Sequence, residues 1–396
     1  MAPAAKRRTK TPYMSDELVS EILARLPVES LLRFRCVCKA WRATISGDAS
    51  FHRAHLRLQK PCLLVSPHTE DLYYLDLDED LLPKDKIGLY RWEPNQQGTT
   101  VPLLHATDLS SDDAMHDFAH CDGLLPWSPG ADPPRRVPGV FSPTSHQAFG
   151  LGRDPRSNTY KVARFFYRSV YARATGGSGY QYYHYTTGME VFTIGTDRHW
   201  RETATQPPYP VLPRRSATFF KGSLIWTVDQ DNLADPAPGF LRFSLENEVF
   251  GVMSPPPCPP RPEYTMSRLA ELRGELCLVC VEQDNELVEM WMCDDVEKPR
   301  WDQRHTVIVS TFMSPDLYPI AAFDDEIVFK QWKYHTRRYD LKTEAFGDVF
   351  RLENLKYHNP STGMLGYQRR FLSYFDVIPY VPSIIPLPKE GFSYFD

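Results

Sequence analysis

Helical spacing of apolar residues, interrupted by one proline, constrains the start of this chain more than any other feature. Leucine, isoleucine and valine recur at three- and four-residue intervals over residues 18–26, which predicts a helix with one apolar face that begins at Ser15 or Asp16. Pro27 predicts the end of this helix, because the residue before a proline is disfavoured in the α conformation.

Three further helical segments are expected, from about Glu29, around Trp41 and around Phe51. So short a domain cannot hide this many large apolar side chains internally, because small domains bury a low fraction of their surface. Some of the leucines are therefore expected to lie against a partner, as a helix face lies in an apolar groove. The alternative is a self-contained helical bundle whose apolar side chains are all internal.

Residues 16–45 resemble the F-box, with the sequence DELVSEILARLPVESLLRFRCVCKAWRATI, and residues 51–58 resemble the segment that follows it in plant F-box proteins. The resemblance implies docking onto the Skp-type adaptor of a cullin-based ubiquitin ligase. It also implies which residues contact the adaptor: Leu18, Ile22, Leu23, Leu26, Pro27, Leu31, Leu32, Val37, Cys38, Lys39 and Trp41.

One departure from the F-box pattern lies at its first two positions. The family usually has Leu-Pro there, and this chain has Met14 and Ser15. Methionine fills a leucine pocket at small cost. Serine lacks the contact of the proline ring but can cap the helix. The departure leaves the strength of adaptor binding open.

From Lys60 onward the apolar pattern changes to two-residue alternation bounded by Pro, Gly, Asp and Asn, which predicts strands. The 35 prolines, 22 phenylalanines and 21 tyrosines of the chain agree with short strands joined by turns. We predict three parts: a disordered basic arm over 1–13, a helical domain over 14–59 and a β domain over 60–396.

Strand–turn segments repeat along the β domain. One series comprises residues 189–200, 242–251, 288–301 and 338–347. A second series begins at Gly123, Gly222, Gly274 and Asp325, and its members from Gly222 onward lie about fifty residues apart, near the period of kelch blades. The repeats predict a multidomain α plus all-β chain whose β domain is a propeller of six or seven blades, with a β-sandwich as the alternative.

Most of residues 60–390 resemble the F-box-associated domain of plants. The segments that carry the resemblance occur in the family's order: CDGLL, FGLGRDPRSNTYKV, MEVFTIGTDRHWRE, KGSLIW, VEMWM, YDLKTE and YVPSIIPL. The resemblance implies the substrate-recognition subunit of an SCF-type (Skp–cullin–F-box) ligase, in which this domain recruits the protein to be ubiquitinated, and it names no client. The apolar C-terminal segment 371–387 is expected to pair with strands near residues 62–65 and close the ring.

Aromatic residues surround a glycine-rich hairpin tip at residues 174–183. Tyrosine is enriched at the energetic centres of interfaces, so client contacts are expected at Tyr171, Tyr180, Tyr182, Tyr183 and Tyr185. The alternative is that these aromatic side chains pack between blades.

The sequence nominates no catalytic, cofactor or metal site. His116 and His120 lie among aspartates in what is expected to be an acidic surface loop. Cys277 and Cys280 fall three apart on a predicted strand, which places them on opposite faces as buried thiols. We therefore predict a non-catalytic protein without cofactor. Two alternatives stay open: an F-box scaffold that does not direct degradation, and a propeller with hydrolase or glycan-binding activity.

Charge and hydropathy limit the partners. The net charge of −5 gives no argument for nucleic-acid binding. No apolar run approaches the roughly 20 residues that a membrane span needs, and the basic start of the sequence is not followed by an apolar stretch of the kind found in secretory signals. An intracellular protein, in the nucleus, the cytoplasm or both, is expected.

Overall fold

The structure, a computed structural model, divides into two compact units. The first holds the helices, up to Lys60, together with residues 381–385, and the second holds the strands from Pro61 to Tyr380. The arm over 1–13 lies outside the described residues, which are 14–69, 87–93, 100–107, 120–122, 124, 147–174, 181–212, 215–230, 233, 238–257, 268–282, 287–308, 317–331, 335–351, 355–358, 365–366 and 372–385.

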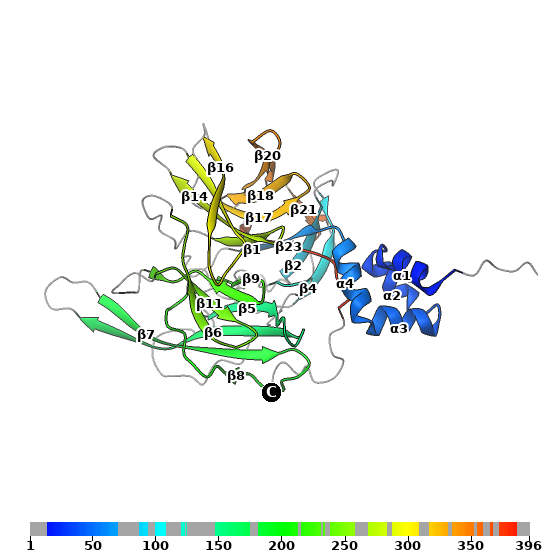
Figure 1. Ribbon diagram of the computed structural model, residues 1–396. Helices are drawn as coiled ribbons and strands as arrows, with labels where there is room; N and C mark the ends of the chain where they lie inside the picture. The colour runs from blue at the N-terminus through cyan, green and yellow to red at the C-terminus, as the bar shows by residue number, and fades with distance from the viewer. Residues whose placement is uncertain are drawn as a thin grey trace, which may run out of the picture. The chain divides into compact units, whose positions relative to one another are not determined.

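Four short helices form the first unit (Figure 1): α1 (Asp16–Ala24), α2 (Val28–Phe34), α3 (Lys39–Gly47) and α4 (Ala49–Leu58). The Ser15 hydroxyl accepts a hydrogen bond from the Leu18 amide and caps α1, and Pro27 occupies the N-cap of α2. The predicted start of the first helix and its end before Pro27 are therefore confirmed.

The core of the helical unit draws on both ends of the sequence. Its buried members come from all four helices: Leu23, Ala24, Leu31, Ile45 and Phe51. Ile384, from the segment that follows the last strand, packs against this cluster. The sequence reading assigned residues 381–385 to the β domain, whereas in the structure they group with the helices.

His55 joins α4 to the chain that follows α1. Its ring is buried, and its Nε2 donates a hydrogen bond to the Leu26 carbonyl oxygen at 3.0 Å. Its Nδ1 is also buried and has no hydrogen-bond partner. Burial lowers the pKa of His55 below its ordinary value of 6.5, the nearby His52 acts in the same direction, and the bond to Leu26 opposes both.

The second unit consists of strands. Their bounds are β1 (Cys62–Thr69), β2 (Ile87–Trp92), β3 (Thr100–Val101), β4 (Leu103–Thr107), β5 (Gln147–Arg153), β6 (Tyr160–Ala174), β7 (Gln181–Thr193), β8 (Arg201–Glu202), β9 (Thr218–Phe220), β10 (Ser223–Trp226), β11 (Phe240–Ser244), β12 (Phe250–Met253), β13 (Leu269–Leu272), β14 (Glu275–Glu282), β15 (Leu287–Cys293), β16 (Trp301–Ile308), β17 (Tyr318–Phe323), β18 (Glu326–Gln331), β19 (His335–Asp340), β20 (Ala345–Arg351), β21 (Lys356–His358), β22 (Leu365–Gly366) and β23 (Leu372–Tyr380).

Within the described residues these strands form five four-stranded antiparallel sheets, the blades, and one three-stranded sheet. The blade orders are β23-β1-β2-β4, β5-β6-β7-β8, β9-β10-β11-β12, β13-β14-β15-β16 and β17-β18-β19-β20. The first strands of neighbouring blades contact one another: β5 contacts β9, β9 contacts β13, β13 contacts β17, and β17 contacts β23. This radial arrangement confirms the propeller and excludes the sandwich alternative.

The expected count of six or seven blades is wrong for the described residues. The expectation rested on repeated segments that lie about fifty residues apart. However, β6 and β7 are 15 and 13 residues long, so one blade consumes more sequence than the period allows. Residues 70–86 and 125–146, which belong to the predicted β domain, lie outside the described part.

Strand alternation explains how the blades hold together. On β14, Leu276 and Leu278 belong to a core shared with the β9–β12 blade, whereas Cys277 and Val279 belong to a core shared with the β17–β20 blade. Successive residues of a strand point to opposite faces, so the β13–β16 blade buries both of its faces between its two neighbours. Cys277 and Cys280 lie on opposite faces as predicted, but Cys280 is disulfide-bonded and not a free thiol.

The repeated segments occupy equivalent positions in successive blades. Gly222 and Gly274 both have positive φ and close the two-residue turns between the first and second strands, a conformation that glycine adopts without steric cost. The Leu245 amide donates to the Gly222 carbonyl oxygen at 2.9 Å, and the Leu341 amide donates to that of Asp325 at 2.8 Å. Gly123, the proposed earlier member, lies outside the described residues.

The C-terminal strand closes the first blade. β23 runs antiparallel to β1 from the pair Cys62–Tyr380 to the pair Thr69–Leu372, and Figure 1 shows the two strands side by side. Buried Phe375 of β23 joins the core that holds Leu63 of β1. The expected pairing of the C-terminal segment with the first strands is confirmed.

Replacing Ile384 with alanine tests its role in the helical core. Because Ile384 is only partly buried, we expect the variant to destabilise the helical unit by about 1–2 kcal/mol. The readout is faster hydrogen exchange at the amides of α1 and α4. The matched control is Ile385→Ala, since Ile385 is no part of the core cluster. Equal effects of the two variants would show that Ile384 contributes nothing specific.

Acidification should destabilise the helical unit through His55. At pH values well above 6.5 the ring is neutral in both the folded and the unfolded chain, so this group adds no pH dependence there. As pH falls below that value, the unfolded chain binds a proton first and stability drops by up to about 1.4 kcal/mol per pH unit. His55→Gln should flatten this slope in hydrogen exchange measured between pH 7.5 and 5. An unchanged slope refutes the assignment.

Candidate functional site

Exposed apolar side chains concentrate on the helical unit. Six of the nine large apolar residues that are exposed in the described part of the chain belong to it: Met14 (51 %), Leu18 (54 %), Ile22 (50 %), Leu32 (50 %), Val37 (59 %) and Leu58 (48 %). Exposed apolar surface of this extent on a unit of about fifty residues is typical of an interaction surface.

Helix α1 carries apolar side chains on two sides, one facing the core of the unit and the other facing solvent. Leu18 and Ile22 are one turn apart and point outward, whereas Val19 and Leu23 pack in the core of the unit. In α2 the adjacent residues Leu31 and Leu32 divide in the same way, since Leu31 is fully buried and Leu32 is half exposed.

The eleven residues expected to contact the adaptor therefore fall into three groups. Leu23 and Leu31 are buried in the core, so in this conformation they support the surface from within. Leu26 and Trp41 are partly buried. The remaining seven are exposed: Leu18, Ile22, Pro27, Leu32, Val37, Cys38 and Lys39. Contact of these residues with an adaptor stays a prediction.

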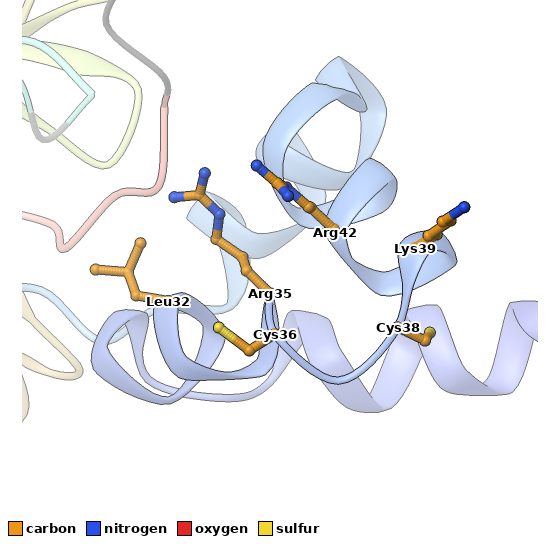
Figure 2. A pocket seen from close by; sticks show the side chains of 6 residues that line it. All are labelled: Leu32, Arg35, Cys36, Cys38, Lys39 and Arg42. Carbon is orange, nitrogen blue, oxygen red and sulfur yellow. The ribbon is translucent and has the colours of Figure 1, made fainter.

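An open hollow of about 480 Å³ adjoins Leu32 and runs from α2 across the following turn to α3 (Figure 2). Its walls are Leu32, Arg35, Cys36, Cys38, Lys39 and Arg42. The Cys38 Sγ accepts a hydrogen bond from the Trp41 amide at 3.4 Å and caps α3, which fixes this turn. The lining contains three cations and no carboxylate, so the hollow favours a partner that offers acidic groups beside apolar ones.

Three wall residues, Arg35, Cys36 and Arg42, were missed by the sequence reading. They lie within the matched stretch of sequence, but the motif names only the residues that recur in it. Their position around Leu32 depends on how α2 packs against α3. The spacing of residues in the sequence does not determine that packing.

The five tyrosines expected to contact a client lie on or beside the β6–β7 hairpin. One end of this hairpin lies in the blade, where β6 pairs with β5 and β7 pairs with β8. Past those contacts, within the described residues, β6 and β7 pair only with each other, so the hairpin extends beyond its blade (Figure 1). Tyr171 lies on β6, and Tyr182, Tyr183 and Tyr185 lie on β7. Their side chains, and Tyr180 altogether, lie outside the described part, so their role stays a prediction.

Within the described ranges, no group of three or more histidine, cysteine or carboxylate side chains could hold a metal ion. His120 belongs to these ranges, and His116 lies outside them. None of the helices in the same ranges has the length and apolar character needed to cross a bilayer.

Comparison with known proteins gives two family matches. Residues 13–53 match the F-box domain, and residues 135–356, more than half of the chain, match the F-box associated beta propeller domain. Among individual proteins of Arabidopsis thaliana, F-box protein At3g07870 is 25% identical over 74% of this chain and 72% of its own length. F-box protein ETP1 is 24% identical over 80% of this chain and 78% of its own.

Solved structures add little. Prolyl oligopeptidase B from Galerina marginata gives a TM-score of 0.29 at 9% identity, over 72% of this chain and 32% of its own. Apo AztD from Citrobacter koseri gives 0.28 at 8% identity, over 82% of this chain and 99% of its own. Likenesses this weak carry no argument about activity. The two family matches and the propeller of blades in the structure show instead that the chain belongs to the family of F-box proteins with an F-box-associated β-propeller domain.

Proposed function

We propose that this chain is the substrate-recognition subunit of an SCF-type ubiquitin ligase. Its helical unit binds a Skp-type adaptor and, through it, a cullin, and its propeller binds the protein to be ubiquitinated. The observation that carries the proposal is the exposed apolar surface of α1 and α2, where the side chains of Leu18, Ile22 and Leu32 are at least half exposed. Burial against an adaptor removes this surface from water.

The basic hollow complements the apolar surface. Leu32 belongs to both, so one partner can cover the apolar side chains and place acidic groups near Arg35, Lys39 and Arg42. Complementary charge of this kind steers association and selects the partner. Met14 is also exposed and offers apolar surface where the family has leucine, and Ser15 serves as the cap of α1.

The subunit acts by proximity and not by chemistry of its own. Holding a client near the charged ubiquitin converts an encounter between separate molecules into a reaction within one complex, which raises the effective concentration of the reacting groups. This role needs two binding surfaces and no catalytic residue. Nuclear or cytoplasmic localisation, where such ligases meet their clients, is part of the proposal.

Client binding is assigned to the propeller, and the extended β6–β7 hairpin is the proposed contact. A ribbon that projects beyond its blade leaves two strand edges for a client to approach. Affinity capture with the full chain and with a version whose residues 170–185 are replaced by an Asn-Gly turn, which removes the projecting strands, tests this role. An identical set of captured proteins would refute it.

Replacing Leu32 with aspartate tests the adaptor surface. Because Leu32 is half exposed, the fold should survive, while a charge in the apolar interface should weaken binding to a purified Skp-type adaptor at least about tenfold. Titration calorimetry measures the affinity, and circular dichroism checks the fold.

The matched control is Leu58→Asp, since Leu58 is the same residue type, is 48 % exposed and lies on α4, outside the expected contacts. We expect it to bind normally. Leu31→Asp is unsuitable, because Leu31 is fully buried and its loss would unfold the unit. Normal binding by folded Leu32→Asp would contradict the proposed function.

A further inference from the structure

Two thiols lie in the basic hollow of the helical unit, and they are the only exposed free cysteines in the described residues. The other four free cysteines there, Cys62, Cys121, Cys277 and Cys293, are buried. Reagents in solution therefore reach Cys36 and Cys38 first.

The two thiols have different surroundings. The Cys38 Sγ accepts the Trp41 amide and caps α3. Cys36 lies in the turn after α2, and its amide donates to the Arg33 carbonyl oxygen at 3.2 Å. Its sulfur is exposed and, among the described residues, has no hydrogen-bond partner. Figure 2 shows the Cys36 sulfur between the Leu32 and Arg35 side chains in this view, with the Cys38 sulfur pointing the other way. Cys36 is thus the thiol free to react.

Positive charge dominates the space around Cys36. Arg35, Lys39 and Arg42 line the same hollow, and within the described residues none of them forms an ion pair. Cations without partners attract anions from solution and raise their local concentration. They also stabilise the transition state of thiol–disulfide exchange, in which the negative charge is shared among three sulfur atoms. A small disulfide with carboxylates is the reagent that this hollow fits.

We propose that Cys36 is a modification site that takes a small anionic disulfide of the glutathione disulfide type. The Cys36 thiol loses its proton to solvent, and the resulting thiolate attacks one sulfur of the reagent. The Cys36–glutathione bond forms as the reagent's own S–S bond breaks, and the departing glutathione thiolate takes up a proton. Cys36 is oxidised and one glutathione is reduced, so no further oxidant is needed.

The modification covers part of the proposed adaptor surface. A glutathione group on Cys36 places bulk beside Leu32 and carboxylates among Arg35, Lys39 and Arg42. It therefore hinders apolar contact and offsets part of the positive charge that would attract an acidic partner. This consequence rests on the proposed function. Modification weakens adaptor binding, and reduction of the mixed disulfide restores it.

The test compares two disulfides of opposite charge on the full chain. Glutathione disulfide is anionic and cystamine is cationic, and intact-mass spectrometry follows the formation of each mixed disulfide at low salt. We expect glutathione disulfide to react about tenfold faster, and we expect salt to reduce the difference. Cys36→Ser should abolish the fast reaction and Cys38→Ser should keep it. Arg35→Glu with Arg42→Glu should remove the preference.

Equal rates for the two reagents, or fast labelling that survives Cys36→Ser, overturn the site. Adaptor titration with modified chain then tests the consequence, and we expect at least about tenfold weaker binding that dithiothreitol restores. Unchanged affinity of the modified chain overturns the regulatory part. Failure of the unmodified chain to bind contradicts the proposed function instead, and the labelling rates still decide whether Cys36 is the site.

Discussion

The antiparallel pairing of β1 with β23 is the constraint on which both units depend. It joins segments that lie some three hundred residues apart in sequence, so it must offset a large loop entropy. The core that includes Leu63 and Phe375 supplies the compensating burial, and the buried amine of Lys330 donates to the Phe375 carbonyl oxygen. The chain then continues directly from β23 to Ile384, which packs in the helical core. One C-terminal stretch thus completes a blade and the helical unit in turn.

In the first two helices of the helical unit, one side of each helix stabilises the fold and another side carries the proposed binding surface. In α1 and α2, Leu23 and Leu31 face the core while Leu18, Ile22 and Leu32 face solvent. The same short helices can therefore hold the unit together and still offer apolar surface to a partner. The propeller uses strand alternation for a different end, because the β9–β12, β13–β16 and β17–β20 blades each pack both faces against neighbouring blades.

Features set by neighbours in sequence were predictable, and features set by distant contacts were less so. Helical spacing and Pro27 located α1 and α2, and the repeated turns at Gly222 and Gly274 located blade hairpins. The place of Ile384 could not be read from sequence, because an apolar residue after a strand looks the same whichever core it joins. The hollow likewise depends on how the turn at Cys36 folds between two helices. The blade count failed because strand lengths vary between blades.

The central claim is that the exposed face of α1 to α3 docks the chain onto a Skp-type adaptor. Hydrogen exchange of the full chain, measured with and without a purified adaptor at saturating concentration, tests it most directly. The account predicts slower exchange over residues 14–42 on binding, with the strands of the propeller unchanged. Protection confined to the propeller, or no protection anywhere in the helices, would contradict it.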